Sequence, residues 1–347
     1  MKQLIDKIAH SYIPSKEELI QLIKCYDKQD IADYIKELAV NIRKRYYGNT
    51  IYIRGLIEIS NYCKNNCYYC GIRRDNSNVC RYRLSKEDIL NCCKTGYDLG
   101  FRTFVLQGGE DKVCDAYIVD VVSSIRKTYP DCAITLSLGE KSYEQYLEYY
   151  KAGANRYLLR HESATLEHYE QLHPSQLSLS NRMNCLNILK EIGYQTGSGF
   201  MVGSPYQTHE HIANDLLYLA DFKPDMIGIG PFIPHKDTIF AAYPHGKLNL
   251  TLFLISLLRI MHPTALIPST TALRSIADNG HLLGISAGAN VIMPNLSPED
   301  AKRNYTLYNN KAHSGNEAAT HLEELKKSMA AIGYSIVTDK GDVYKKL

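Results

Sequence analysis

Three cysteines lie within eight positions of one another in the stretch "NYCKNNCYYCGIRRDN", at Cys63, Cys67 and Cys70. Three thiols cannot pair among themselves without leaving one over, and they are one short of the four ligands that a closed structural zinc site takes. On a loop, C-x3-C-x2-C can instead hold three corners of an iron–sulfur cube and leave the fourth iron open to a non-protein ligand. The alternative is a zinc site completed by a distant histidine, since the chain has 12 histidines.

The elements that must position this loop alternate between strands and helices. Eight short β-branched or apolar runs predict strands, at residues 51–60, 103–109, 133–139, 156–162, 196–203, 226–234, 265–271 and 290–295. Helix-length stretches separate them, such as 85–100, where Ser85 is a candidate N-cap. This alternation predicts parallel pairing in a (β/α)8 barrel of the TIM type, with an open doubly wound sheet as the alternative. The cysteines directly follow the first strand, at the barrel end where active sites lie.

The rest of the chain predicts a barrel at 51–296, an N-terminal helical extension at 1–50 and a short C-terminal helical tail at 297–347 that packs on the barrel. A net charge of +3 does not favour nucleic acid or an anionic membrane as a partner. No stretch of eighteen apolar residues occurs, and the charged N-terminus does not resemble a signal peptide. We therefore expect a cytoplasmic protein, in which the 10 cysteines are reduced.

The cysteine loop resembles the cluster motif of radical S-adenosylmethionine (SAM) enzymes, with Tyr69 at the aromatic position before the last cysteine. Residues 107–111, "QGGED", resemble the Gly-Gly-Glu element of that superfamily. Gly108 and Gly109 permit close backbone approach to a ligand, and Glu110 supplies an acceptor for a cation. The resemblance implies one 4Fe-4S cluster and SAM as cofactors.

Longer phrases narrow the resemblance, among them "RYLLRHE", "MIGIGPFIPHKDT", "IPSTTA" and "GANVIMPN". They are similar to the HydE maturases of FeFe-hydrogenase, from about residue 50 to 310, and more distantly to biotin synthase and methylornithine synthase. No cysteine follows Cys185, which argues against a second cluster.

The HydE resemblance implies assembly of the FeFe-hydrogenase diiron site. SAM would be cleaved reductively to a 5′-deoxyadenosyl radical that reacts with a small cysteine-bound iron carbonyl and cyanide complex. The partners would be other hydrogenase maturases and a one-electron donor. One alternative is a radical SAM mutase or sulfur-inserting enzyme acting on a small amino-acid-like substrate. Another is a non-catalytic metal-binding or electron-transfer protein.

The resemblance also implies roles for residues around SAM. Glu110 would receive its amino group, Arg182 its carboxylate and Glu162 its ribose hydroxyls, with Met201 and Tyr305 beside it. Each has an alternative: Glu162 could form a salt bridge with Arg160 or Arg156, Arg182 could be a solvated helix charge, and Met201 and Tyr305 could be core residues.

Polar residues at alternate strand positions predict a substrate pocket inside the barrel. They are Thr135, Ser137, Arg156, Arg160, Thr270 and Thr271. Hydroxyls and two arginines on one face of a strand would form a basic floor for a small anionic ligand, since barrel interiors are otherwise filled by aliphatic residues. The alternative is that Arg156 pairs with an acid such as Glu140 at the rim.

Overall fold

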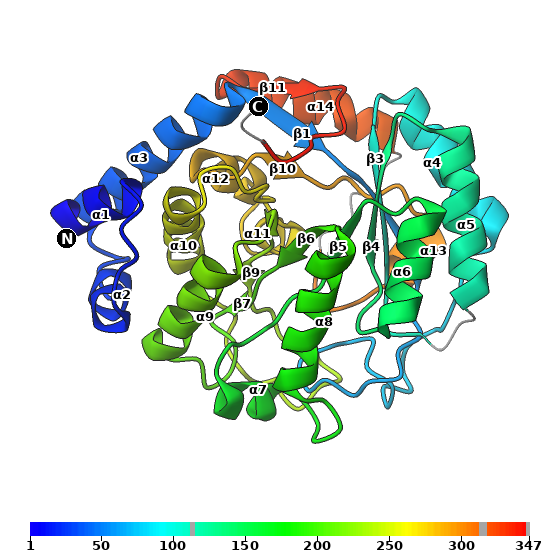
Figure 1. Cartoon of the computed structure of the whole chain (residues 1–347), viewed down its shortest axis with the longest axis horizontal. Coiled ribbons are helices and arrows are strands. Elements are labelled where there is room, and N and C mark those ends of the chain that lie inside the picture. Colours follow the sequence, from blue (N-terminus) through cyan, green and yellow to red (C-terminus); the bar gives the residue numbers. More distant parts are fainter. Residues whose placement is uncertain (112–114, 312–317, 345–347) are drawn as a thin grey trace.

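A parallel sheet that closes into a barrel lies at the centre of the computed structural model, which describes residues 1–111, 115–311 and 318–344 (Figure 1). Six of its strands lie side by side in the order β2 (Gly55–Ser60), β3 (Thr103–Gly108), β4 (Ala133–Ser137), β5 (Arg156–Leu158), β6 (Gln195–Ser198) and β8 (Met226–Ile227). Single parallel bridges complete the ring, from Met226 to Leu266, from Pro268 to Val291 and from Asn295 back to Leu56. The predicted (β/α)8 fold class is confirmed.

Two predicted strands are interrupted where they run next to each other. The stretch 196–203 forms β6 and β7 (Met201–Val202), and 226–234 forms β8 and β9 (Gly230–Pro231). At the break Gly199 has φ +154°, and a Cβ built there would lie 2.0 Å from the Gly228 carbonyl oxygen. Only glycine permits this approach, so both strands bend at the same level.

Helices surround the barrel (Figure 1). Those within the barrel segment are α4 (Lys86–Asp98), α5 (Asp115–Thr128), α6 (Tyr143–Ala152), α7 (Leu166–Leu172), α8 (Leu179–Ile192), α9 (His209–Phe222), α10 (Leu248–Met261), α11 (Thr271–Ile276) and α12 (Gly280–Ser286). Ser85 caps α4 as predicted, since its hydroxyl accepts a hydrogen bond from the Asp88 amide in a capping box. Within the described ranges, no helix is both long and apolar enough to cross a membrane.

The N-terminal residues form the predicted helices, α1 (Lys2–Ala9), α2 (Lys16–Ile23) and α3 (Gln29–Tyr47). Lys16 pairs with Glu210 of α9 at 2.5 Å, and Ile35 of α3 shares one apolar core with Leu254 of α10. These helices share an apolar core with the barrel. The predicted domain boundaries at residues 50 and 296 therefore stay predictions.

The C-terminal tail contains α13 (Glu299–Asn304) and α14 (Ala318–Ala331), and also a strand that the sequence did not indicate. This strand, β11 (Ser335–Val337), pairs in parallel with β1 (Thr50–Ile53), whose other neighbour is β10 (Val291–Ile292). Its three residues are too few to show an alternating pattern. Residues 312–317 and 345–347 of the predicted tail lie outside the described residues.

After β11 the chain crosses the amino ends of the barrel strands. Thr103, the first residue of β3, donates to the Lys340 carbonyl at 2.8 Å. The Tyr344 amide donates to the Tyr47 hydroxyl at 3.0 Å, and Val343 packs in a small apolar cluster that includes Val291. The segment 338–344 therefore closes the floor of the barrel, opposite the end that carries the cysteines.

Candidate active site

The three cysteines lie on the loop after β2, at the carboxyl end of the barrel, and each is partly buried. Burial and the nearby thiol of Cys63 raise the pKa of Cys70 to about 12. Burial and the thiols of Cys70 and Cys63 raise the pKa of Cys67 well above its ordinary value. Crowded thiols of this kind become thiolates only when a positive centre binds them. The donor set therefore fits an iron–sulfur cluster.

A zinc site completed by a distant histidine was the alternative for the cysteine loop. Among the residues that the structure describes, no three His, Cys, Asp or Glu side chains are grouped to hold one ion. His173 lies near the loop, but its Nδ1 is 2.8 Å from the Tyr169 carbonyl and its Nε2 is 3.2 Å from the Tyr69 hydroxyl. Both of its ring nitrogens are therefore engaged.

Arg81 holds the cysteine loop in place, a role that the sequence gave no signal for. Its guanidinium donates to the carbonyl oxygens of Asn61 at 2.5 Å, Ile72 at 2.8 Å, Arg73 at 2.6 Å and Asn76 at 3.2 Å. These carbonyls come from both sides of the cysteines. One planar cation thus joins the two ends of the loop.

The predicted Gly-Gly-Glu turn lies against the start of the loop. The Lys64 amide donates to the Glu110 carbonyl at 2.8 Å, and a Cβ built on Gly109 would lie 2.3 Å from the Tyr62 carbonyl oxygen. Gly108, beside it, ends β3. The absence of a side chain at Gly109 thus brings the Glu110 carboxylate next to the cysteines.

Glu110 and Arg182 form the centre of a buried charge network at this end of the barrel. Arg182, on α8, donates to Glu140 at 2.6 Å and to the Arg160 carbonyl at 3.1 Å, and it lies 3.7 Å from Glu110. Burial alone would lower the pKa of Arg182, but the Tyr169 oxygen and the carboxylates of Glu140 and Glu110 raise it well above its ordinary value. Arg182 is therefore a buried, paired cation and not a solvated helix charge.

One oxygen of the Glu110 carboxylate has no hydrogen-bond donor within the described ranges. The ammonium group of Lys64 lies 3.4 Å from this oxygen and forms an ion pair with it, but the Lys64 side chain is well exposed. A buried acceptor that lacks a hydrogen bond costs about 1–3 kcal/mol, so its presence beside the cysteines points to a ligand that donates there. The residues present therefore fit an amino group such as that of SAM.

Glu162 follows β5 with a φ of +64°, which is strained for a residue with a side chain. Its amide donates to the Gly199 carbonyl at 3.1 Å, and its carboxylate pairs with Arg160 at 2.8 Å. The salt bridge weighed as the alternative therefore exists. It leaves the predicted ribose contact as a proposal.

Met201 and Tyr305 are both buried. Met201 packs with Leu172 and Phe232, and the Tyr305 hydroxyl accepts a hydrogen bond from Gln107 at 3.3 Å. These contacts are those of core residues that border the site. A role beside SAM stays a prediction for both.

Polar atoms without partners mark the interior of the barrel. Thr135 Oγ1, Arg160 Nε and Thr270 Oγ1 are buried and have no hydrogen-bond partner in the described part of the chain. Ser137 ends β4 and Thr271 begins α11, and both are partly exposed. The predicted role of these five residues as substrate contacts stays a prediction.

Arg156 does not belong to this group, which corrects the expectation of a basic floor made by two arginines. It is the first residue of β5, so it lies at the amino end of the barrel, where its side chain is 0% exposed and pairs with Asp342 at 2.7 Å. The same guanidinium donates to the carbonyls of Lys340 at 2.8 Å and Gly341 at 3.0 Å. The alternative, in which Arg156 pairs with an acid, is therefore the correct one. The acid is Asp342 of the C-terminal segment and not Glu140.

The sequence also gave no prediction for a buried ion pair between Glu58 and Lys311. The Lys311 ammonium donates to the Glu58 carboxylate and, at 3.0 Å, to the Tyr305 carbonyl. Burial raises the pKa of Glu58 against the opposing charge of Lys311. The charged residue inside the apolar run "LIEIS" was the one available signal.

With this geometry described, known proteins give the site its context. The sequence model of the radical SAM superfamily matches residues 57–219. The [FeFe] hydrogenase maturase subunit HydE of Thermotoga maritima is 47% identical over 277 residues, which cover 79% of this chain and 78% of that protein. The chain belongs to the HydE family. It is a radical SAM enzyme, and the superfamily implies a 4Fe-4S cluster and SAM.

Other known proteins are less similar to this chain in sequence. The 3-methylornithine synthase of Methanosarcina barkeri is 30% identical over 298 residues, 85% of this chain and 83% of that protein. The crystal structure of methylornithine synthase superposes with a TM-score of 0.83 at 26% identity, covering 96% of this chain and 97% of the other. The structure of HydG, at 21% identity, a TM-score of 0.80 and coverage of 96% and 75%, supports the fold alone.

Proposed function

We propose that this HydE-family chain holds one 4Fe-4S cluster on Cys63, Cys67 and Cys70 and uses it to cleave SAM during assembly of the FeFe-hydrogenase diiron site. When bound and reduced, the cluster supplies the electron that splits SAM into methionine and a 5′-deoxyadenosyl radical. The observation that carries the proposal is the incomplete cysteine set beside the Glu110 oxygen that lacks a hydrogen bond and the buried Arg182.

The chain's own residues would bind and orient SAM. Glu110 accepts its ammonium group, and Arg182 offers a planar guanidinium to its carboxylate once it loosens its bond to Glu140. Glu162 accepts the ribose hydroxyls from a backbone position already fixed by the Gly199 carbonyl. Gly108 and Gly109 let the backbone approach the ligand, while Met201 and Tyr305 border it.

The substrate would lie deeper, among the unpaired polar atoms of Thr135, Arg160 and Thr270. By the HydE relationship, it is a small iron complex that carries cysteine, carbon monoxide and cyanide. An anionic complex suits Arg160, because this guanidinium has a free buried Nε in the described structure and only one carboxylate partner, Glu162. Ser137 and Thr271 add hydroxyls. The partners are other hydrogenase maturases and a one-electron donor.

A second candidate is a radical SAM mutase that acts on a small amino acid. The observation in its favour is the likeness to methylornithine synthase, with a TM-score of 0.83 over nearly the whole chain. The identity of 47% to HydE, against 30% to 3-methylornithine synthase, favours the maturase.

The deciding experiment measures 5′-deoxyadenosine after anaerobic reconstitution, reduction and addition of SAM. We expect slow formation without substrate and faster formation with the cysteine-bound iron complex, but not with free small amino acids. A double variant Cys67→Ala and Cys70→Ala is the matched control and should form none. Stimulation by a free amino acid instead would favour the mutase, and no cleavage by the reconstituted wild type would refute the enzyme.

A further inference from the structure

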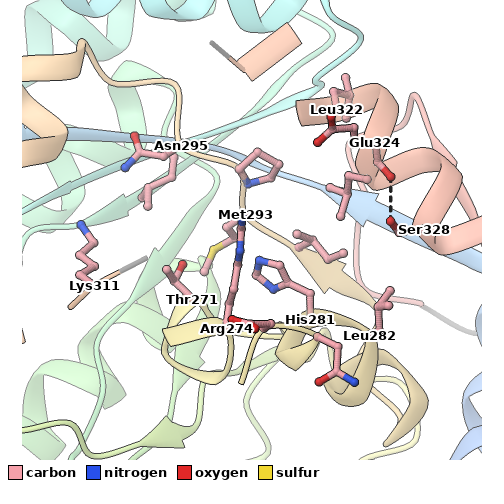
Figure 2. A pocket seen from close by; sticks show the side chains of 16 residues that line it. Thr271, Arg274, His281, Leu282, Met293, Asn295, Lys311, Leu322, Glu324 and Ser328 are labelled. Carbon is pink, nitrogen blue, oxygen red and sulfur yellow. Dashed lines mark hydrogen bonds between the residues drawn. The ribbon is translucent and has the colours of Figure 1, made fainter. Parts of the chain in front are cut away.

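A cavity of about 380 Å³ lies beside the barrel and shares only Thr271 with the proposed substrate pocket. It is bounded by α11 and α12 on one side, by α14 on another and by the chain around β10 (Figure 2). Its volume falls within the range of about 300–1,000 Å³ that is typical of small-molecule sites.

The inner end of this cavity reaches the barrel interior. Lys311 lines it, and the Lys311 ammonium group donates to Glu58, which projects from β2. Leu56, which also lines it, lies two positions before Glu58 and so shares its face of the strand. Thr271 lines the cavity as well and directly follows Thr270 of the proposed substrate pocket. The cavity and the proposed pocket are therefore neighbours.

The outer end opens to solvent between α12 and α14. Asp278, Asn279 and Glu324 line it there and are exposed. Among the described residues, the lining of the cavity therefore runs from exposed side chains on the outside to residues next to the barrel interior. A molecule on this path does not pass the cysteine loop.

The walls carry both signs of charge and an apolar surface. Figure 2 shows Arg274 and His281 next to each other. Burial and the charge of Arg274 lower the pKa of His281 to about 4, so the imidazole is neutral and Arg274 is the cation at this place. Asp278 and Glu324 supply carboxylates toward the outside, and the apolar wall comes from Leu282, Ile292, Met293 and Leu325.

We propose that this cavity is a second binding site, which takes a small amino-acid-like zwitterion with an apolar side chain, and that the cysteine-bound substrate of the proposed function, which carries an amino acid, enters the barrel by the same route. Arg274 binds the carboxylate of the zwitterion, and the acids at the outer end attract its ammonium group. The aliphatic residues contact its side chain. The entry function rests on the proposed function, whereas binding at the site does not.

Binding is tested by equilibrium dialysis of radiolabelled L-leucine against the reconstituted holoenzyme with saturating SAM, which occupies the open iron. We expect one saturable site, with isopentylamine and 4-methylpentanoate at least about tenfold weaker because each lacks one charged group. Arg274→Gln should bind leucine no better than isopentylamine. Absence of saturable binding, or equal binding of all three compounds, overturns the proposal.

The position of the site is tested by filling the cavity from two sides. Ser328→Trp on α14 and Leu282→Trp on α12 both place an indole at a lining position and should abolish leucine binding. Lys327→Trp, at an exposed neighbouring position on α14 outside the lining, is the matched control and should bind like wild type. Wild-type binding by either lining variant, provided that it melts like the control, places the site elsewhere and refutes the proposal.

The entry function is tested with the same variants in the 5′-deoxyadenosine assay. Ser328→Trp should lower substrate-dependent kcat/KM about tenfold or more while substrate-independent cleavage stays unchanged, because Ser328 on α14 is not among the residues proposed to hold the cluster or SAM. An unchanged kcat/KM refutes entry by this route. If the wild type cleaves no SAM, the proposed function fails instead, and the dialysis result still decides the site.

Discussion

Asp342→Asn removes one charge from the segment that closes the barrel floor and keeps the shape of the side chain. In the wild type, the carboxylate accepts a hydrogen bond from Arg156 at 2.7 Å and one from Gln195 at 2.9 Å. The variant leaves a guanidinium with 0% exposure without its anionic partner. We expect the free energy of unfolding to fall because a buried cation has lost its counter-charge.

The size of the loss follows from the surroundings of the pair. Removal of one partner from a fully buried pair costs about 3–5 kcal/mol. The Asp342 side chain is 43% exposed, so water screens the pair, and Arg156 keeps its bonds to two tail carbonyls, Gln195 and Thr103. A charged hydrogen bond contributes about 1.5–3 kcal/mol, and we therefore expect a loss of about 2 kcal/mol.

The assay is urea unfolding followed by circular dichroism at several pH values. Burial alone would raise the pKa of Asp342, but the bonds from Arg156 and Gln195 lower it below its ordinary value. A lowered pKa means that the stabilisation is complete above the unfolded pKa of about 3.9 and is lost as the pH falls through the folded pKa. The difference between wild type and Asp342→Asn should thus be constant near neutral pH and shrink in acid.

Asp98→Asn provides the control, because Asp98 pairs with Lys94 at 2.6 Å on the exposed face of α4. An exposed pair of this spacing contributes only about 0.3–0.5 kcal/mol. Equal losses in the two variants would show that the Asp342 pair behaves as a surface pair. A loss that does not depend on pH would show that the charge of Asp342 is not its cause.

Three further predictions concern the active site. The reconstituted chain should hold about four irons, as one cube requires, and a stable yield near eight would contradict the single cysteine trio. Glu110→Ala should keep its iron but bind SAM about 10- to 100-fold more weakly in equilibrium dialysis, since the ammonium loses a charged partner; loss of iron with unchanged SAM affinity would contradict its role. Arg160→Ala should retain substrate-independent SAM cleavage and lose substrate-dependent turnover, with little rescue by Arg160→Lys; a wild-type rate would place the pocket elsewhere.

The sequence was sufficient for the order of the barrel strands because each carries an apolar run between helices. It was also sufficient for the place of the cysteines, since the loop after a barrel strand lies at the carboxyl end. It did not indicate Arg81, whose partners are carbonyl oxygens that have no side-chain signal. It did not pair Glu58 with Lys311 either, because 253 positions separate them along the chain.

Arg156 shows the limit of reasoning from strand spacing. Residues four apart on a strand point to the same side, which is why Arg156 and Arg160 were expected in one pocket. Four residues also span about 13 Å along the strand, at about 3.3 Å each, so a shared side does not mean a shared depth. Arg156 lies at the amino end of β5 and Arg160 lies beyond its carboxyl end.

These two arginines place the same guanidinium group at opposite ends of the barrel, where its partners differ. All three guanidinium nitrogens of Arg156 have partners within the fold, so this cation serves the closed floor. Arg160 leaves its buried Nε without one in the described residues, as Thr135 and Thr270 leave their hydroxyls. Each such group costs about 1–3 kcal/mol unless a ligand pairs with it. Stability alone does not account for these three groups, and we expect a polar ligand to pair with them, as the Arg160→Ala variant tests.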